Sequence, residues 1–312
     1  MISIIMSVYN ERVQWVREAT ESMLNQTFRD FEFIIVIDNP NLPEDIAAYL
    51  KQAAQQDDRI RLLPNEKNVG LAQSLNNGIA AARGEFIARM DSDDISDIHR
   101  LEKEMAFLQK TGCDMVSSNK INIDEEGQHI SQDPPIEKDP NISMPFGNPI
   151  IHSSVLMRTD AVRKLNGYRL MVNSEDYDLW MRWLDAGYTI GILDEPLLLY
   201  RLRANSASIG RQLEQFYVTR YIAALHKQRK KNNGKDSFSK QEETAYLKKC
   251  RLTEPRKRRF AKANRYVETA LKDMQQGKKL GCAGNMLKAS VCFPRLGYTV
   301  ASNFIQYHRA CK

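Results

Sequence analysis

Short apolar runs alternate with amphipathic helical patterns along the first 200 residues of the chain. These patterns indicate strands at residues 2–8, 31–37, 60–63, 86–90 and 115–123, and helices at residues 13–25, 43–55, 71–82 and 96–110. The run at residues 31–37 is apolar almost throughout, which is typical of a strand covered by helices on both faces of a sheet. The alternation predicts an α/β fold with a largely parallel, doubly wound sheet.

The rest of the chain divides into an irregular stretch and a helical one. Residues 131–149 are rich in proline and polar side chains and are expected to form a loop. Further strands are expected at residues 153–158, 188–193 and 197–201, and further helices at residues 159–165 and 175–186. We expect glycines to end four of these helices, namely Gly84, Gly112, Gly167 and Gly187. The organisation predicted is an α/β domain at residues 1–208 and a basic helical C-terminal region at residues 209–312.

The net charge of +6 is distributed unevenly along the chain. Residues 201–312 contain 26 Lys and Arg against 7 Asp and Glu, a net charge of +19. Residues 1–200 contain 19 Lys and Arg against 32 Asp and Glu, a net charge of −13. A basic surface attracts phosphate-bearing partners, such as anionic lipid, lipid phosphate or nucleic acid.

The spacing of the cysteines and the length of the apolar runs limit where in the cell the protein is expected. The five cysteines are irregularly spaced without a C-x-x-C pair, so we expect neither a disulfide framework nor a zinc site, and a reducing cytoplasm fits best. Residues 1–8 are apolar but lack a basic leader, and are expected to form a core strand rather than a signal peptide. No apolar run is long enough to span a bilayer, so any membrane association is expected to be peripheral.

Polar side chains follow three of the predicted strands. Ser7-Val8-Tyr9-Asn10-Glu11 covers the end of the first strand, Asp38 follows the second, and Asp91-Ser92-Asp93-Asp94 follows the strand at residues 86–90. Ligands of open α/β sheets bind beyond the carboxyl ends of the strands, so these groups are expected to meet at one edge.

Carboxylates in this set suggest two chemical roles. Asp91 and Asp93 offer hard oxygen ligands for Mg²⁺ or Mn²⁺, although a turn and a helix cap would explain the same triplet. Glu175 and Asp176 open a predicted helix, where a carboxylate can serve as a general base or simply complement the helix dipole. Asp38 is either a nucleoside acceptor or a turn residue.

Four other positions have both a structural and a functional interpretation. Asn68 and Gly70 either form a loop with a helix cap or place backbone N–H groups near a diphosphate. Trp180 stacks on a sugar or packs in the core. Arg201 pairs with a diphosphate or is a surface cation.

Taken in order, these segments resemble the family 2 glycosyltransferases, which have the GT-A fold. The resemblance spans nearly all of residues 1–205 and is carried by Ser7–Glu11, Ile35–Asp38, Asn68–Asp94 and Glu175–Trp180. No single motif is decisive, but the ordered set is highly specific. The resemblance implies that a metal-dependent enzyme transfers a sugar from a nucleotide-diphosphate donor with inversion at the anomeric carbon.

The resemblance also implies a role for each matching position. Residues that would contact the nucleotide are Val8, Tyr9, Asn10, Glu11, Asp38, Asn68, Gly70, Asn76, Asp91 and Ser92. Asp93, with Asp91, would bind Mn²⁺ or Mg²⁺. Asp176, beside Glu175, would take the proton from the acceptor hydroxyl. A lone histidine is more often a packed or surface residue than a ligand, but the resemblance to bacterial polysaccharide transferases implies that His152 contacts diphosphate or acceptor.

Some residues depart from the family pattern. Ser7 stands where proline is usual, and Asn39-Pro40 follows Asp38 where Asp-Gly-Ser is usual, so the shape of the base pocket is not predicted. Processive members of the family carry Q-x-x-R-W, whereas this chain has Leu179-Trp-Met-Arg-Trp183. Addition of one sugar per binding event is therefore expected.

Family frequency favours a UDP-sugar donor and a saccharide or lipid-linked saccharide acceptor in bacterial surface-polysaccharide assembly. Two basic clusters, Lys227–Lys231 and Arg256–Arg259, are expected to bind an anionic membrane at the cytoplasmic face of the inner membrane. Three alternatives remain. A sugar nucleotidyltransferase would need a glycine-rich phosphate loop, but residues 3–12 contain no glycine. A nucleic-acid-binding protein could use the basic C-terminal region, but the acidic residues 1–200 would repel nucleic acid, and the third alternative is a transferase that has lost its activity.

Overall fold

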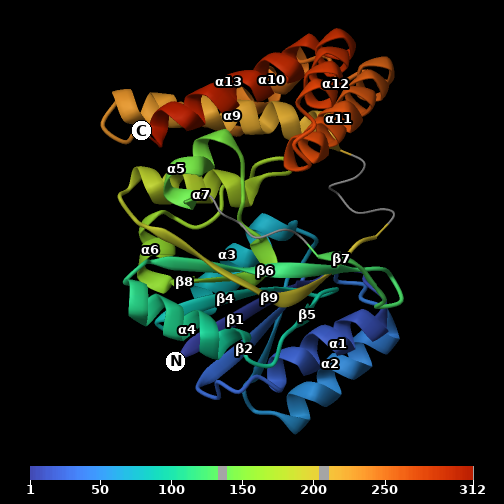
Figure 1. The fold of residues 1–312 in the computed structure, drawn as a ribbon. Helices are drawn as coiled ribbons and strands as arrows, with labels where there is room; N and C mark the ends of the chain where they lie inside the picture. The colour runs from blue at the N-terminus through green and yellow to red at the C-terminus, as the bar shows by residue number, and fades with distance from the viewer. Residues whose placement is uncertain (133–138, 204–210, 312) are drawn as a thin grey trace. The chain divides into compact units, whose positions relative to one another are not determined.

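The computed structural model describes residues 1–132, 139–203 and 211–311 (Figure 1). Among these, residues 1–144, 148–171 and 175–203 form one compact unit, and residues 145–147, 172–174 and 211–311 form a second. The predicted boundary at residues 208–209 lies outside the described residues and stays a prediction. No helix in the described part of the chain has the length and apolar character needed to cross a membrane.

A mixed β-sheet forms the centre of the first unit, with the strand order β3-β2-β1-β4-β8-β6-β9-β5 and with β7 paired to β6. Strands β1, β2, β3 and β4 are mutually parallel, as are β6 and β9, whereas β8 runs antiparallel between β4 and β6. The strands are β1 (Ile2–Val8), β2 (Phe31–Ile37), β3 (Ile60–Pro64), β4 (Phe86–Asp91), β5 (Ile95–Ser96), β6 (Met115–Ile123), β7 (His129–Gln132), β8 (Val155–Arg158) and β9 (Ile190–Arg201).

Helices cover both faces of this sheet, which explains why its central strands β1 and β2 are largely apolar. Ile4 and Met6 of β1 pack in a core with α1, α2 and α4, whereas Ile5 faces α3, where Gly78 allows close approach. The helices are α1 (Val13–Leu24), α2 (Glu44–Gln56), α3 (Leu71–Ala81), α4 (Arg100–Thr111), α5 (Pro140–Ser143), α6 (Thr159–Lys164) and α7 (Glu175–Asp185). The predicted α/β fold is confirmed.

The carboxyl ends of three strands lie level at one edge of the sheet. Val8 at the end of β1 is opposite Ile37 of β2, and Ser7 is opposite Asp91 of β4. The polar segments that follow these strands therefore leave the sheet side by side, as the sequence predicted.

The helix predicted at residues 96–110 begins later, at Arg100. Residues Ile95 and Ser96 instead form β5, which pairs with β9. Gln26 fixes this arrangement: its Nε2 donates to the Asp97 carbonyl at 2.6 Å, and its Oε1 accepts the Leu101 N–H at 3.0 Å. A partner distant in sequence sets the start of this helix.

Three other predicted elements differ in detail. The strands expected at residues 188–193 and 197–201 are one strand, β9, whose pairing with β6 is irregular near Asn119. The predicted loop at residues 131–149 contains α5, and its residues 133–138 lie outside the described part. The strand expected from residue 153 begins at Val155, because residues 152–154 form a 3₁₀ turn.

Gly84 does not close a helix, contrary to expectation, since α3 ends at Ala81. A Cβ on Gly84 would lie 2.6 Å from the Ser3 backbone nitrogen, so glycine is required by the close approach of β1. The Gly84 N–H also donates to Ser3 Oγ at 2.8 Å. Gly112, by contrast, takes the left-handed conformation at the end of α4, as predicted.

The second unit is helical in its C-terminal part, as predicted: α9 (Gln212–Lys231), α10 (Lys240–Lys249), α11 (Glu254–Gln275), α12 (Lys279–Cys292) and α13 (Pro294–Ala310). Aromatic side chains from α9 and α11 meet Phe293 between α12 and α13, with ring centroids of Phe260 and Phe293 at 5.3 Å. This unit therefore has an apolar core of its own.

We expect Gly84→Ala to destabilise the protein by about 1–3 kcal/mol, because the added methyl group can be accommodated only by moving the backbone of β1. The free energy of unfolding from denaturant titration measures this loss. Gly147→Ala, where no atom lies within 4 Å of the added Cβ, is the matched control and should be near neutral. Equal stability of the two variants would contradict the packing argument.

Candidate active site

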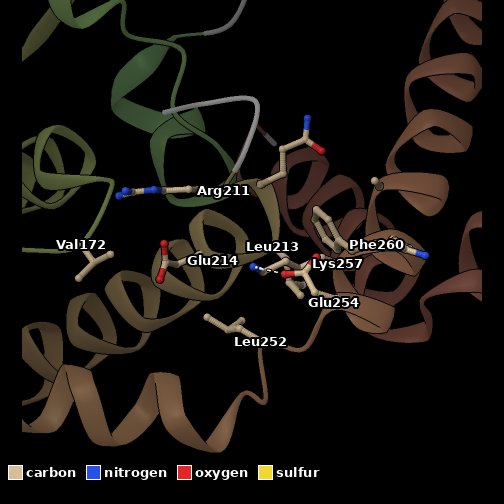
Figure 2. Close-up of a pocket in the computed structure, with 11 residues that line it drawn as sticks. Val172, Arg211, Leu213, Glu214, Leu252, Glu254, Lys257 and Phe260 are labelled. Atoms are coloured by element: carbon tan, nitrogen blue, oxygen red, sulfur yellow. Dashed lines mark hydrogen bonds and ion pairs between the residues drawn. The ribbon is translucent and has the colours of Figure 1, made fainter. Parts of the chain in front are cut away.

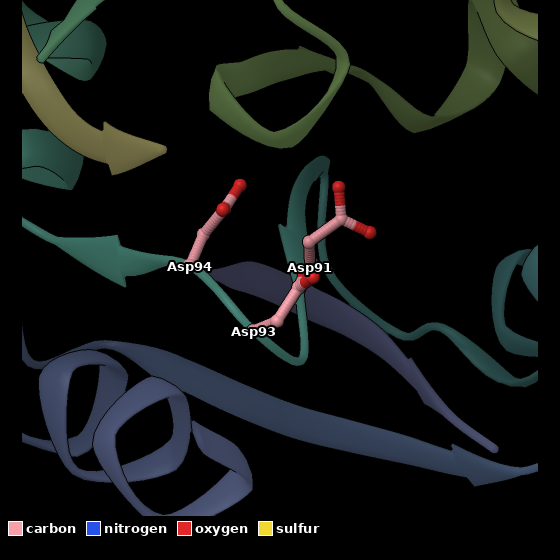
Figure 3. A group of neighbouring side chains, drawn as sticks. All are labelled: Asp91, Asp93 and Asp94. Atoms are coloured by element: carbon pink, nitrogen blue, oxygen red, sulfur yellow. The ribbon is translucent and has the colours of Figure 1, made fainter. Parts of the chain in front are cut away.

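Three aspartates gather where β4 leaves the sheet. The carboxylates of Asp91, Asp93 and Asp94 each offer one oxygen atom within 4.8 Å of the others, and Figure 3 shows them around a single turn. Hard oxygen donors at this spacing suit Mg²⁺ or Mn²⁺, which use one or two protein carboxylates and leave positions for phosphate oxygens.

The three aspartates have different surroundings. Asp94 is buried, and its two oxygens accept hydrogen bonds from Ser153 Oγ at 2.6 Å and from the Arg201 N–H at 2.9 Å. Burial, together with the charges of Asp91 and Asp93, raises the pKa of Asp94 well above its ordinary value. Asp94 thus fixes the loop, and Asp91 and Asp93 are the better candidates for metal ligands.

Asp93 is buried and pairs with a half-buried cation. Burial and then the charge of Asp91 raise the pKa of Asp93 to about 6. Its Oδ2 lies 2.8 Å from Nε of Arg203, a half-buried cation. Arg203 was not among the predicted site residues. The sequence feature that could have identified it is the pair Arg201 and Arg203, which are two residues apart at the end of β9.

Arg89 is a buried cation beneath the acidic turn. It lies two residues before Asp91 on β4, on the same face of the strand, and the two form an ion pair. Burial acts to lower the pKa of Arg89, but the Asp91 carboxylate outweighs it and the net shift is upward. Its positive charge also lowers the pKa of both Asp93 and Asp176.

Asp176 lies in the first turn of α7, and its Oδ2 accepts a hydrogen bond from Asn148 Nδ2 at 2.9 Å. Burial and then the neighbouring Glu175 raise the pKa of Asp176 to about 6, against the opposing effects of the Tyr177 backbone, Asn148 and Arg89. Arg89 therefore pairs with Asp91, and its charge also favours the ionised forms of Asp93 and Asp176.

His152, Tyr168 and Trp180 form an aromatic group beside this cation. His152 Nε2 lies 2.9 Å from Tyr168 Oη, and both rings stand edge-on to Trp180. Burial, followed by the charge of Arg89, lowers the pKa of His152 well below its ordinary value, so the imidazole is neutral at pH 7. Trp180 has 0% of its surface exposed, so the prediction that it stacks on a sugar is wrong and its alternative as a core residue holds.

Arg201 fits neither predicted interpretation, since it is buried and not a surface cation. Its guanidinium donates to the carbonyls of Asp93, Asp124 and Glu125 and to the Glu18 carboxylate, at 2.7–3.1 Å. These partners leave it unable to pair with a diphosphate. Arg201 instead ties the end of β9 to the acidic turn.

The loop after β1 has an exposed tyrosine and an ordered turn. Val8 ends the strand as a buried residue, and 47% of the Tyr9 surface is exposed. Glu11 accepts the N–H groups of Tyr9 and Asn10 at 2.9 and 3.2 Å, and Asn39 donates to the Tyr9 carbonyl at 2.9 Å. The Tyr9 ring is therefore presented on a fixed loop. Ser92, between Asp91 and Asp93, is buried.

Asp38 holds the loop that leads into α3. It is buried, and its carboxylate accepts hydrogen bonds from Asn65 Nδ2 and from the N–H groups of Val69 and Gly70, at 2.8–2.9 Å. Gly70, with φ of 83°, adopts the conformation that glycine tolerates, and Asn68 Oδ1 also accepts its N–H at 3.1 Å. Asp38 thus positions Asn68 and Gly70, and its own contact with a nucleotide stays a prediction.

Asn76 is paired with the backbone of Tyr168. Its Nδ2 donates to the Tyr168 carbonyl and its Oδ1 accepts the Tyr168 N–H, both at 2.8 Å. A direct contact of this amide with a nucleotide would compete with these bonds. In the structure, Asn76 connects α3 to the segment that carries Tyr168.

A separate cavity of about 650 Å³ lies in the second unit and involves none of the predicted site residues. Figure 2 shows that cationic, anionic and apolar side chains face it. Its lining residues are Val172, Arg211, Gln212, Leu213, Glu214, Leu252, Glu254, Lys257, Arg258, Phe260 and Ala261.

Comparison with known proteins gives the family of the chain. Residues 3–165 match the family model for glycosyl transferase family 2. An O-antigen biosynthesis glycosyltransferase of Escherichia coli, WbnJ, is 36% identical over 210 residues, which are 66% of this chain and 81% of that protein.

Two solved structures are similar in fold. Residues 1–349 of Staphylococcus aureus TarS, in complex with UDP, superpose with a TM-score of 0.60 at 15% identity over 93% of this chain and 90% of that one. A mannosyltransferase of Pyrobaculum calidifontis, in complex with GDP-Man and Mn²⁺, gives a TM-score of 0.55 at 14% identity over 98% and 85%. With its acidic turn at the carboxyl edge of an α/β sheet, the chain belongs to glycosyltransferase family 2.

Proposed function

We propose that this protein is an inverting glycosyltransferase that moves one sugar from a UDP-sugar to an acceptor hydroxyl of a surface polysaccharide or its lipid-linked precursor. The observation that carries the proposal is the cluster of Asp91, Asp93 and Asp94 where β4 leaves the sheet, beside the carboxyl ends of β1 and β2. Asp93 with Asp91 would serve the donor phosphates there, and Asp176, whose pKa the charge of Arg89 also lowers, would serve the acceptor. The E. coli relative acts in O-antigen synthesis and the S. aureus structure holds UDP, in keeping with this choice.

The donor nucleotide would bind along the edge formed by β1, β2 and β4. Tyr9, exposed on its ordered loop, is suited to contact the base, and Asp91 with Ser92 is suited to contact the ribose. Val8, Asn10 and Glu11 shape the same loop, whereas Asp38 and Asn76 contribute by holding neighbouring segments. The backbone at Asn68 and Gly70 lies at the start of α3, where a helix favours an anion.

Asp93, with Asp91, would hold Mn²⁺ or Mg²⁺, since their oxygens match the donor set that these ions prefer. A divalent ion bound there would supply charge neutralisation for the departing diphosphate. Arg203, which pairs with Asp93 in the structure, is a second cation suited to contact the same phosphates.

Asp176 would act as the general base on the acceptor. Its carboxylate takes the proton of the acceptor hydroxyl, whose oxygen forms a bond to the anomeric carbon as the bond to the diphosphate oxygen breaks. Attack from the face opposite the nucleotide inverts the configuration in a single displacement. A pKa near 6 leaves Asp176 ionised at pH 7 and more basic than an ordinary carboxylate.

The C-terminal region, residues 209–312, would bring this catalytic domain to an anionic bilayer at the cytoplasmic face of the inner membrane. On α12, Leu280, Leu287 and Val291 are 91%, 67% and 71% exposed, and their spacing places them on one face of the helix. Apolar exposure within residues 209–312, which contain 24 Lys and Arg against 7 Asp and Glu and so carry a net charge of +17, is suited to an acidic lipid surface. Arg229 of the first basic cluster is buried against Asp236, so exposed neighbours would provide the contact.

Asp93→Ala should abolish metal-dependent donor binding, because it removes the carboxylate best placed for the ion. Calorimetric titration of UDP-sugar with Mn²⁺, and again with a chelator, measures the effect. Asp160→Ala, which removes an exposed carboxylate of α6, is the control and should bind as the unaltered protein does. Metal-dependent binding that survives in Asp93→Ala would refute the assignment.

Asp176→Asn should preserve donor binding but lower kcat by about 10²- to 10⁴-fold, in line with loss of a general base. A product assay with radiolabelled donor measures kcat, and the same titration measures donor affinity. Transfer at the normal rate in this variant would exclude Asp176 as the base.

The pH dependence offers a further check, because Asp176 accepts a proton only when it is ionised. Activity should rise with pH through about 6, the value to which burial and Glu175 raise the pKa of Asp176. Glu175→Gln removes the second of these causes, so the acidic limb of the kcat profile should move to lower pH. An unmoved limb, or a loss of activity as large as in Asp176→Asn, would show that Glu175 has another role.

Membrane binding should depend on exposed cations of the second unit. Alanine at Lys227, Lys231 and Arg258 should weaken binding to anionic vesicles about 100-fold, since each cation contributes on the order of 1 kcal/mol. Vesicle co-sedimentation measures this affinity. Alanine at three exposed lysines of the first unit, Lys51, Lys110 and Lys164, gives the same charge change and should have little effect.

Unchanged vesicle affinity in the first triple variant would contradict the membrane proposal. A salt-sensitive gel shift with duplex or single-stranded nucleic acid would instead favour the nucleic-acid alternative. Both measurements use the full chain.

A further inference from the structure

The segment that enters α7 has an unusual backbone. Asn173 has φ of 50° and Ser174 has φ of 154°, values that residues with a side chain rarely adopt. Glu175 and Asp176 follow directly. Such a conformation persists only where neighbouring groups hold it, and strained residues of this kind gather at functional sites.

Side chains of α10 and α9 hold this segment within the second unit. The Val172 N–H donates to Glu243 Oε1 at 2.8 Å, and Asn173 Nδ2 donates to Glu214 Oε2 at 2.6 Å. Arg211 Nη1 donates to Asn173 Oδ1 at 3.0 Å. Two consecutive residues ahead of α7 are thus fixed by hydrogen bonds to charged groups, which are stronger than those between neutral groups.

Glu243 is the more constrained of the two glutamates. Its surface is 1% exposed, and Lys240 Nζ donates to its Oε2 at 2.6 Å. A buried carboxylate is unfavourable unless it is paired and hydrogen-bonded. Glu243 meets this requirement with Lys240 and with the Val172 N–H, so its burial is coupled to the position of the Val172 backbone.

The other side of the segment is open. Val172, Arg211 and Glu214 are among the residues that line the cavity of about 650 Å³ (Figure 2). Close packing therefore does not fix the segment on this side, and its conformation depends on the hydrogen bonds from Glu214, Arg211 and Glu243.

We propose that Glu243 and Glu214 are positioning residues for sugar transfer, which hold residues 172–174 and so set the start of the helix that presents Asp176. The proposal rests on the proposed role of Asp176 as the base. Because the chain continues directly from Ser174 into Glu175, a shift in the held segment moves Asp176. The helical C-terminal region would then contribute to catalysis in addition to any role in localisation.

The test compares alanine and glutamine at Glu243 in the full chain. Glu243→Ala removes the acceptor of the Val172 N–H, so kcat for transfer should fall about tenfold or more while the donor KM stays within about twofold. Glu243→Gln keeps a carbonyl oxygen for that N–H and should recover most of kcat. Glu242→Ala, one residue away and exposed, is the matched control and should behave as the unaltered protein.

Glu214→Ala and Glu214→Gln repeat the comparison at a half-buried position, so the test survives if Glu243→Ala fails to fold. A normal kcat in both alanine variants would overturn the proposal. The proposal would also be overturned if thermal denaturation showed that loss of folded protein explains the fall in kcat. An equal fall in kcat in the glutamine variants would overturn it as well. If Asp176→Asn transfers sugar at the normal rate, the proposed role of Asp176 as the base fails. If Asp176→Asn loses activity while the alanine variants of Glu243 and Glu214 keep a normal kcat, the positioning role alone is wrong.

Discussion

The site depends on how buried arginines balance a crowded group of carboxylates. Asp91, Asp93 and Asp94 lie close enough for strong mutual repulsion, and burial adds to the unfavourable energy of their charged forms. Arg89 lies beneath them as a buried cation, and Arg201 holds the backbone of the same turn. The charge of Arg89 reaches Asp176 as well, so one cation connects the group proposed to bind metal with the proposed base. Without these arginines the turn could not keep its carboxylates together.

Sheet topology brings these groups together from distant parts of the sequence. Strand β4 carries Arg89 and Asp91, and β9 carries Arg201 to the same edge through its pairing with β5 and β6. The Arg201 N–H then bonds to Asp94, across 107 positions of sequence. The carboxyl edge of the sheet is thus fixed by long-range bonds before any ligand binds, in keeping with the preorganisation that transfer reactions require.

Sequence patterns predicted the strands, the acidic turn and the acidic start of α7 because each depends on local periodicity or on spacing within a few residues. They failed where a contact with a residue distant in sequence determines the local structure. The start of α4 depends on Gln26, and the burial of Trp180 depends on how α7 packs with His152 and Tyr168. The position of β9 in the sheet brings Arg201 to the Asp93 carbonyl and Arg203 to the Asp93 carboxylate. No local sequence pattern reveals this position.

The most direct measurement is a crystal structure of the full chain with UDP and Mn²⁺, with the ion located by its anomalous scattering. We predict one strong peak in coordination contact with Asp93, bridging to the diphosphate, with the Asp176 carboxylate facing the same space. A peak away from the acidic turn, or an Asp176 side chain on the opposite side of the sheet edge from the ion, would contradict the account.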